Sequence, residues 1–463
     1  MLRFVLTLTG VFLMSFAALA QSPAPSILPD SEISSLIATR IDDENRGVGI
    51  VVGVLEPEGT RIVTYGKLSK DDPSPLTGDT LFEIGSISKV FTALLLADAV
   101  ERGEVRLDQP VADFLPEGVS MPERDGVKIT LLDLATHMSG LPRLPDNFKP
   151  QNPANPYLGY DEGDLHAFLN AYELPRGVGE AFEYSNLGYG LLGHVLATRA
   201  GTDYASLLRE RILAPLGMNR TASALDPDFR EGLASGHAAS LDPVPNWDLG
   251  LFAGAGAVRS TANDMLLFLG AATGQVETPL APAFALMLET RRSTGAEGTD
   301  IALGWFVVAR DPGEIVWHNG ATGGYTASTG FRRADGAGVV VLTNTAHEAG
   351  GEDIGLHLLD PSLPLSQPPV ERTAIDLAPG VLDRYVGRYQ LSPDFFIEVT
   401  REGDGLFAQA TGQDRFEIFP ESDTAFFYTV VDAQIRFETD AEGRGTGLVL
   451  TQHGQNLPGQ RLE

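Results

Sequence analysis

The strongest constraint on the fold is a change of sequence pattern near residue 360. A stretch with four prolines, from Pro361 to Pro369, separates a long segment of mixed patterning from a shorter one in which apolar and polar residues alternate. The chain has 463 residues, more than the roughly 250–300 that a single hydrophobic core usually organises. The pattern therefore predicts one domain at residues 30–360 and a second at 372–463, with a proline-rich linker at 361–371.

The longer segment starts and ends with strand-like runs. Residues 47–55 and 60–65 are rich in β-branched side chains and flank a Glu-Pro-Glu-Gly hairpin signal. Helices and loops predominate from about 105 to 290, including a Pro/Asn-rich stretch at 141–157 that we expect to be a surface loop. Further β-rich runs follow at 301–309, 314–318, 325–331 and 338–343. We therefore expect an α+β fold, with one antiparallel sheet built from both ends, helices flanking it and an inserted helical lobe.

The segment after the linker is predicted to be all-β. Short alternating runs follow one another with charged or glycine-containing turns between them, at 385–389, 395–400, 406–410, 416–419, 425–431, 434–439 and 447–452. Evenly spaced strands without a helical period are typical of a small closed sheet. We expect a β-barrel at 372–463.

The N-terminus indicates export. Arg3 precedes an apolar run from Phe4 to Ala17, and Ala18-Leu19-Ala20 places small residues where a signal peptidase cleaves. The apolar run is short for a membrane span. We expect a signal peptide at 1–20, a mobile leader at 21–29 and a periplasmic or secreted protein with no membrane contact beyond the export signal.

Composition argues against several classes of partner. The 62 acidic residues outnumber the 33 basic ones and give a net charge of −29, which disfavours nucleic acids and anionic membranes. The chain has no cysteine, and none of its eight histidines forms a His-x-His or His-x-x-x-His pair. We therefore expect no metal site and no cofactor, and a small-molecule or peptide substrate as the partner. The sequence leaves the oligomeric state open.

Ser86 and Lys89 are the residues that most clearly indicate chemistry. They lie near the start of a predicted helix at 82–102, after Gly85, which lets the backbone turn sharply. The spacing places both side chains on one helix face. The positive end of the helix and burial would both lower the pKa of Lys89, and a neutral amine within reach activates a serine hydroxyl. Taken alone, the tetrapeptide also fits an N-cap serine followed by a solvent-facing lysine.

Two further motifs could complete such a site. Tyr184 and Asn186 stand in a polar loop before an apolar helix, where the phenol could relay protons and the amide could bind a substrate carbonyl or orient the lysine. His318 ends a strand and is followed by a glycine-rich run at 319–324, in which the amide of Ala321 is a candidate oxyanion donor. Taken separately, a tyrosine packed at a helix entry and a structural histidine would also explain these residues.

Together the three motifs carry a family resemblance. Ser86-x-x-Lys89, Tyr184-x-Asn186 and His318-x-Gly320, in this order, resemble the active-site motifs of class C β-lactamases and related DD-peptidases. The flanking segments at 81–86, 129–141 and 212–218 agree with that family, and the resemblance covers residues 30–360.

The resemblance implies a serine hydrolase that cleaves an amide, lactam or ester bond through an acyl-Ser86 intermediate. It implies that Lys89 and Tyr184 move protons, that Asn186 orients the substrate, and that the amides of Ser86 and Ala321 form an oxyanion hole. The C-terminal segment, from Tyr385-Val386-Gly387-Arg388-Tyr389 onward, resembles the lipocalin-like accessory domain of some penicillin-binding-protein-like peptidases.

One residue departs from the family pattern. The β-lactamases usually carry a lysine where this chain has His318, whereas some DD-peptidases and D-amino-acid peptidases of the superfamily have histidine. The resemblance therefore leaves β-lactamase, DD-peptidase or D-aminopeptidase, and esterase activities open. A penicillin-recognising sensor or a binding protein is the non-enzymatic alternative.

Overall fold

The computed structural model describes residues 27–462 apart from 225–231, 311–312, 348, 368–371, 393–394, 412, 414, 432 and 453–454. The predicted signal peptide at 1–20 lies outside the described residues. The chain divides into two compact units after Ser366. Ile27, in the leader segment expected to be mobile, is instead buried, because its apolar side chain joins the same core cluster as Ile33 and Ile37.

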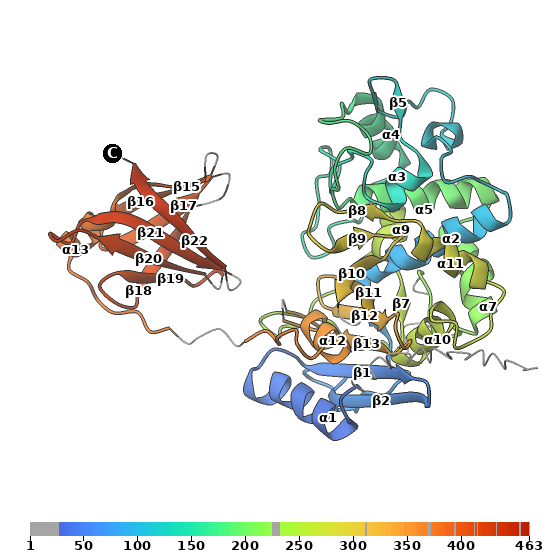
Figure 1. Ribbon diagram of the computed structural model, residues 1–463, viewed down its shortest axis with the longest axis horizontal. Coiled ribbons are helices and arrows are strands. Elements are labelled where there is room, and N and C mark those ends of the chain that lie inside the picture. The colour runs from blue at the N-terminus through green and yellow to red at the C-terminus, as the bar shows by residue number, and fades with distance from the viewer. Residues whose placement is uncertain are drawn as a thin grey trace, which may run out of the picture. The chain divides into compact units, whose positions relative to one another are not determined.

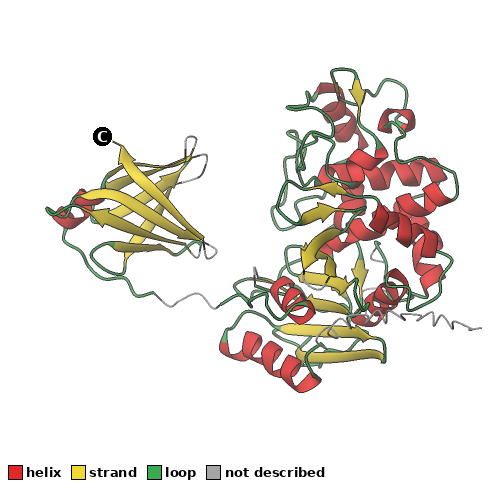
Figure 2. Ribbon diagram, in the orientation of Figure 1, coloured by secondary structure: helices red, strands yellow, loops and turns green. Residues whose placement is uncertain are grey.

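An eight-stranded antiparallel sheet forms the centre of the first unit (Figures 1 and 2). Its strand order is β2 (Gly59–Gly66), β1 (Gly49–Glu56), β13 (Gly338–Thr343), β12 (Thr326–Arg332), β11 (Gly313–Ala321), β10 (Phe306–Arg310), β9 (Thr299–Ile301) and β8 (Arg292–Ser293). The N-terminal hairpin β1–β2 pairs through β1 with β13, so strands from both ends of the unit share one sheet. The predicted α+β fold is confirmed.

Both faces of this sheet are covered, which explains why β1 and β13 are nearly continuous apolar runs. Because successive side chains point to opposite faces, Val52 of β1 packs in the cluster that holds α1 (Asp30–Ala38) and α12 (Glu352–Leu359). Its neighbour Val51 packs in the larger core, with α10 (Ala262–Ala272) against that face.

The helical lobe lies between β2 and β8 in the sequence. Its helices are α2 (Ser88–Glu101), α3 (Leu131–Ala135), α4 (Glu162–Ala171), α5 (Asn186–Ala200), α6 (Tyr204–Leu208), α7 (Ala214–Leu216), α9 (Ala253–Gly256) and α11 (Ala281–Glu289). Helices α2 and α5 are buried almost all round, with α9 packed against both. The first two motifs lie where these two buried helices begin.

The backbone of two glycines changes the predicted elements. The helix expected at 82–102 begins only at Ser88, because Gly85 adopts a left-handed φ of 49° and starts a 3-10 turn. The strand expected at 301–309 is divided into β9 and β10, because Gly304 has a φ of 76°. A left-handed glycine interrupts regular structure in a way that hydrophobic periodicity does not reveal.

The stretch at 141–157 is irregular, as expected, but it is not wholly a surface loop. Leu141 and Tyr157 are buried in the main core cluster. Burial of these apolar side chains fixes the loop against the lobe, so the segment can contribute defined side chains to a site.

The second unit is a closed barrel of eight antiparallel strands in up-and-down order. The strands are β15 (Gly387–Ser392), β16 (Phe395–Glu402), β17 (Gly405–Ala410), β18 (Arg415–Pro420), β19 (Ala425–Tyr428), β20 (Ala433–Thr439), β21 (Gly445–Gln452) and β22 (Gln455–Leu462). Tyr389, Phe426 and Phe437 pack in its interior. The predicted barrel is confirmed, but β22 was missed, because Pro458 and Gly459 are unusual inside a strand.

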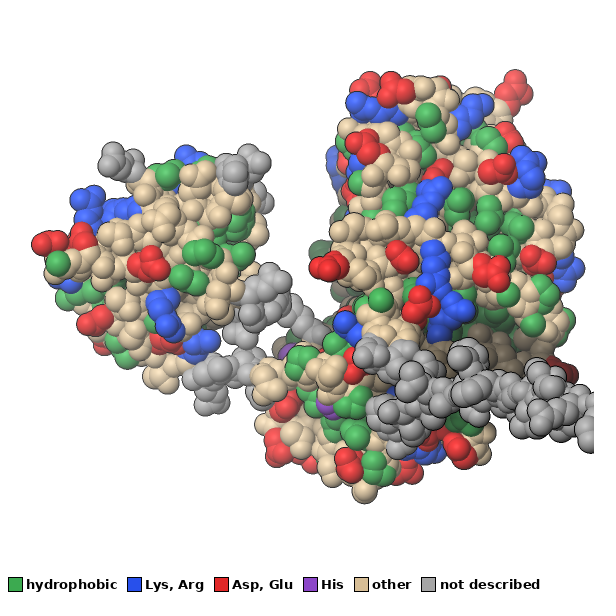
Figure 3. All heavy atoms as spheres, viewed as in Figure 1, with side chains coloured by type: hydrophobic (Ala, Val, Ile, Leu, Met, Phe, Trp, Pro, Cys, Tyr) green, Lys and Arg blue, Asp and Glu red, His purple; other side chains and the backbone are tan. Residues whose placement is uncertain are grey.

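No helix among the described residues is both long and apolar enough to cross a membrane. On the faces visible in Figure 3, acidic and basic side chains are interspersed over each unit. The chain's excess of acidic residues is therefore not gathered into a single visible patch.

Candidate active site

Ser86 lies on the 3-10 turn directly before α2, and Lys89 lies in the first turn of that helix. The Nζ of Lys89 is 3.0 Å from the Oγ of Ser86 and 2.8 Å from the carbonyl oxygen of Ala255 on α9. The lysine is fully buried, whereas the serine is partly exposed. The alternative of a solvent-facing lysine is therefore wrong.

The surroundings of Lys89 favour its neutral form. Burial, and after it the positive charge of Arg143, lower the pKa of the amine well below its ordinary 10.5. The amine also lies 4.8 Å from the centroid of the Tyr184 ring. Because a neutral amine carries a lone pair, Lys89 can accept the proton of the Ser86 hydroxyl.

Tyr184 lies in the loop that leads into α5 and reaches Ser86. Burial raises the pKa of its phenol to about 12, although a hydrogen bond with the Ser86 side chain lowers it somewhat. The phenol is therefore protonated at neutral pH. Its ring stacks on the imidazole of His137, with ring centroids 4.4 Å apart and planes 28° apart.

His137 is a site residue that the motifs did not reveal. It is buried, and its backbone has a left-handed φ of 57°, which is uncommon outside glycine. Its Nδ1 accepts a hydrogen bond of 3.0 Å from the amide of Ser185, so the loop that carries Tyr184 is held to it. Burial lowers the pKa of His137 well below 6.5, and the nearby basic groups Lys89, His318 and Arg143 lower it further, which keeps the ring neutral.

Asn186 begins α5 and lines a cavity of about 190 Å³ together with Ser86. Its Oδ1 is buried without a hydrogen-bond partner among the described residues, and the same holds for the Oγ1 of Thr322 in the cavity wall. Buried polar atoms are almost always hydrogen-bonded. The two atoms thus mark where a polar ligand would supply the missing partners.

His318 lies on β11 and is 1% exposed. Its Nδ1 is 2.5 Å from the carbonyl oxygen of Asn319; a carbonyl can only accept, so Nδ1 carries the proton. Burial, and after it Lys89, lower the pKa of His318 to about 3, although the bond to Asn319 opposes this shift. At neutral pH the residue that replaces the family's lysine is therefore uncharged.

Gly320 and Ala321 pack directly against the backbone of the nucleophile turn. A side chain at Gly320 would lie 2.9 Å from the amide nitrogen of Ser86, and one at Gly85 would lie 2.6 Å from the amide nitrogen of Ala321. Both Ser86 and Ala321 also line the cavity. Close backbone contact therefore holds these two residues on the same cavity wall.

Three further cavity residues, Arg143, Tyr157 and Trp247, come from loops and were not predicted. The backbone of Trp247 is held by a buried ion pair. Arg259 donates to Glu83 at 2.9 Å and to the carbonyl oxygen of Trp247 at 2.7 Å. These residues carry no local motif, so only the folded loops bring them to the site. Among the described residues, no group of three or more acidic or histidine side chains is placed to hold a metal ion.

The fold and the site together define a serine hydrolase of the penicillin-recognising type. The chain belongs to the family described as Beta-lactamase, whose family model matches residues 34–360. A second family model, described as a domain of unknown function (DUF3471), matches residues 371–461. The resemblance noted in the sequence is thereby confirmed.

Relatives and solved structures agree. The chain is 28% identical over 432 residues to Penicillin-binding protein 4* of Bacillus subtilis (strain 168), covering 87% of this chain and 92% of the relative. It is 27% identical over 327 residues to the D-alanyl-D-alanine-carboxypeptidase/endopeptidase AmpH of Escherichia coli (strain K12), covering 67% and 83%. A crystal structure of the class C β-lactamase from Rhodobacter sphaeroides superposes with a TM-score of 0.59 at 28% identity, covering 68% of this chain and 94% of that one.

Proposed function

We propose that this hydrolase acylates Ser86 with the carbonyl group of an amide, lactam or ester, and that Lys89 is the general base. The observation that carries the proposal is the 3.0 Å contact between a fully buried amine and the serine hydroxyl. A buried amine with a lowered pKa is a base rather than a surface charge. The adjoining cavity gives a substrate access to the serine.

In the acylation step, the Oγ of Ser86 forms a bond to the carbonyl carbon, and its proton moves to Lys89, which becomes an ammonium. The carbonyl π electrons move to the oxygen. The amides of Ser86 and Ala321 are our candidates for the donors that stabilise this oxyanion. Asn186, with its free Oδ1 in the cavity, orients the substrate.

Tyr184 is the proton donor to the leaving group. Because its pKa is about 12, the phenol holds a proton at neutral pH and can donate it as the carbon–nitrogen or carbon–oxygen bond breaks. The ammonium of Lys89 then returns a proton to the phenolate. Water then attacks the acyl-Ser86 ester and gives a proton to Lys89. As the bond between the carbonyl carbon and Oγ breaks, Lys89 returns that proton to Oγ, so the acid is released and the serine hydroxyl is restored.

We infer the substrate classes of this chain from the names of its relatives and from the charges in the site. Those relatives are named as a penicillin-binding protein and a D-alanyl-D-alanine-carboxypeptidase/endopeptidase, and we propose a β-lactam or a D-amino-acid peptide for this chain. A neutral His318 supplies no charge on β11 for a substrate carboxylate. An efficient β-lactamase or carboxypeptidase would therefore have to bind the carboxylate of its substrate through a cation from another element.

We also propose that the protein is exported. Arg3, the apolar run from Phe4 to Ala17 and the small residues Ala18 and Ala20 support cleavage after residue 20. The N-terminal sequence of protein secreted or released from the periplasm tests this: it should begin at Gln21, and an intact Met1 in that fraction would contradict cleavage.

The central test is the mass of the protein after incubation with a penicillin. We expect a covalent adduct on Ser86, no adduct in Ser86→Ala, and an unchanged adduct in Ser74→Ala, which removes an exposed serine elsewhere. Turnover of a chromogenic cephalosporin, a D-Ala-D-Ala peptide and a short-chain nitrophenyl ester then ranks the activities.

The outcomes separate the alternatives. If the wild type turns over at least one of the three substrates and Ser86→Ala does not, the protein is a hydrolase that uses Ser86. A stoichiometric burst without turnover would instead identify a sensor. Absence of an adduct, together with undiminished ester hydrolysis in Ser86→Ala, would contradict acylation of Ser86.

A further inference from the structure

Arg143 lines the same cavity as Ser86, and its position is fixed by the backbone. Its carbonyl oxygen accepts hydrogen bonds from the amides of Asn186 at 3.0 Å and Leu187 at 3.2 Å. The preceding carbonyl, of Pro142, accepts a bond of 2.7 Å from the hydroxyl of Ser185. The loop that carries Arg143 is therefore tied to the start of α5, where Asn186 enters the site.

The guanidinium of Arg143 is available to a ligand. The side chain is exposed, and its Cζ lies 5.3 Å from the centroid of the Tyr184 ring. Nearby arginines are paired with carboxylates, as in Arg176–Glu183 and Arg292–Asp133. No described carboxylate forms an ion pair with Arg143, although acidic residues outnumber basic ones by 62 to 33 in the chain.

The remaining walls of the cavity supply no fixed charge. Among the described residues that line it, Arg143 alone has a charged side chain. Lys89 lies behind Ser86 and favours its neutral form, and His318 is buried and uncharged at neutral pH. The permanent positive charge that the site presents to a substrate therefore comes from the loop at 143 and not from the third motif.

We propose that Arg143 determines specificity, by selecting substrates that carry a carboxylate near the scissile carbonyl. The assignment rests on acylation of Ser86 as proposed above. A guanidinium offers paired N–H donors that match the two oxygens of a carboxylate. The unpartnered Oδ1 of Asn186 and Oγ1 of Thr322 in the same cavity bind neutral polar groups of that substrate.

The test compares matched nitrophenyl and phenyl esters on the full chain. One pair carries the charge on the acyl part: the 4-nitrophenyl monoester of glutaric acid and its methyl ester. The other carries it on the leaving group: 3-carboxyphenyl and 3-carbamoylphenyl butanoate. The measured quantity is the ratio of kcat/KM between the anionic and the neutral ester of each pair, which shows on which side of the bond the carboxylate is bound.

For at least one pair, Arg143→Gln should lower this ratio on the order of 10- to 100-fold, because hydrogen bonds to charged groups are among the strongest in proteins. Arg143→Lys should keep part of the preference, since it retains the charge without the planar fork. Added salt should lower the wild-type ratio and leave the Arg143→Gln ratio nearly constant.

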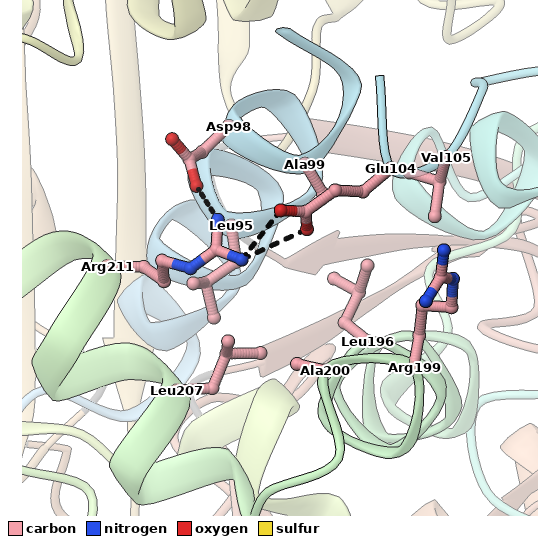
Figure 4. Close-up of a pocket in the computed structure, with 10 residues that line it drawn as sticks. All are labelled: Leu95, Asp98, Ala99, Glu104, Val105, Leu196, Arg199, Ala200, Leu207 and Arg211. Carbon is pink, nitrogen blue, oxygen red and sulfur yellow. Dashed lines mark hydrogen bonds and ion pairs between the residues drawn. The ribbon is translucent and has the colours of Figure 1, made fainter. Parts of the chain in front are cut away.

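Arg199→Gln is the matched control. Arg199 is an exposed arginine on α5 and lines a small separate pocket (Figure 4). The same pocket contains the ion pairs of Arg211 with Asp98 and Glu104. It lies 13 residues beyond Asn186 along the helix, roughly 20 Å at 1.5 Å per residue. Its replacement removes the same charge far from Ser86 and should leave both ratios unchanged.

A pH profile separates a charge effect from a structural one. Since the charge of Arg143 lowers the pKa of Lys89, its removal should move the acidic limb of kcat/KM for a neutral ester to higher pH. An unchanged ratio on both ester pairs in Arg143→Gln, or an equal fall in Arg199→Gln, would overturn the assignment. Ester hydrolysis that survives in Ser86→Ala would contradict the proposed function itself. This result does not depend on the kcat/KM ratios of the anionic and neutral esters.

Discussion

The two units differ in what they bury. The barrel interior holds aromatic and aliphatic side chains, and its buried tyrosines bond to backbone, as Tyr389 does to the carbonyl of Tyr385 at 2.8 Å. The first unit instead buries Lys89, His137 and His318 around the ring of Tyr184. Burying ionisable groups is unfavourable unless they are neutral or paired. The first unit therefore contains a cluster that is costly for stability and useful for chemistry, whereas the barrel core serves stability.

The largest expected effect comes from removing the buried amine. Lys89→Met should lower kcat/KM for the best ester on the order of 10³-fold or more, because Ser86 loses its base. The same variant should be as stable as the wild type, or more stable by about 1 kcal/mol, since a thioether is cheaper to bury than an amine. Denaturant unfolding and steady-state kinetics measure both quantities.

Lys70→Met is the control, because Lys70 is a half-exposed lysine away from the site. It should change neither quantity appreciably. A marked destabilisation of Lys89→Met would contradict this expectation, since the amine would then contribute to the stability of the first unit.

The barrel core offers the opposite test. Phe437→Ala should destabilise the second unit by about 3–5 kcal/mol, because Phe437 is buried against Tyr385, with ring centroids 4.4 Å apart. Calorimetry of the full chain should show the barrel transition at lower temperature and the transition of the first unit in place. Phe396→Ala, at a partly exposed phenylalanine of the barrel, should have a much smaller effect. A shift of both transitions by Phe437→Ala would show that the units do not unfold separately.

Tyr184→Phe tests the proton relay within the cluster. It keeps the ring that stacks on His137 and removes the hydroxyl, so kcat/KM should fall about 100-fold without loss of stability. Because the pKa of Tyr184 is about 12, the phenol stays protonated, and the loss should be constant from neutral pH to about pH 10. A loss that varies strongly over this range would mean that the phenol ionises within it.

The smallest effect concerns stability in acid. The pKa of His318 falls from its ordinary 6.5 to about 3 in the folded chain. Between these values the unfolded chain binds more protons, so the free energy of unfolding should decrease as the pH falls below 6.5. His318→Gln should reduce this decrease by about 1–2 kcal/mol at about pH 5.5 in denaturant titrations. An identical acid sensitivity in the variant would assign the effect to other groups.

The three motifs could be recognised in the sequence because each is local. Ser86 and Lys89 are one helical turn apart, and Tyr184 and Asn186 flank a helix start, so short-range spacing already restricts their geometry. The structure brings Tyr184 and Asn186 to Ser86. It places His318 on β11, with its ring centroid 6.4 Å from that of Tyr184. The spacing of the motifs did not show how deeply their side chains are buried. In the structure Lys89 is fully buried and does not face solvent, and burial leaves His318 uncharged at neutral pH.

The residues that the sequence did not predict depend on long-range packing. Arg143 and Trp247 reach the cavity from separate loops, and neither stands in a recognisable motif. His137 lay within a segment noted only as family context, and its left-handed backbone could not be read from the sequence. Strand β22 was missed for a local reason, since Pro458 suppresses a strand pattern although it pairs with Val449 in the closed barrel.

The direct backbone contact between the turn at Gly85 and the strand at Gly320 has a consequence for how such a site can diverge. With no side chain between them, the spacing of the Ser86 and Ala321 amides is set by main-chain atoms alone. Substitutions in the surrounding loops can therefore alter which molecules enter without moving the reacting groups. New specificities can therefore arise by changing cavity residues such as Arg143 or Trp247. A side chain at Gly320, in contrast, would push the strand that carries Ala321 away from the turn that carries Ser86.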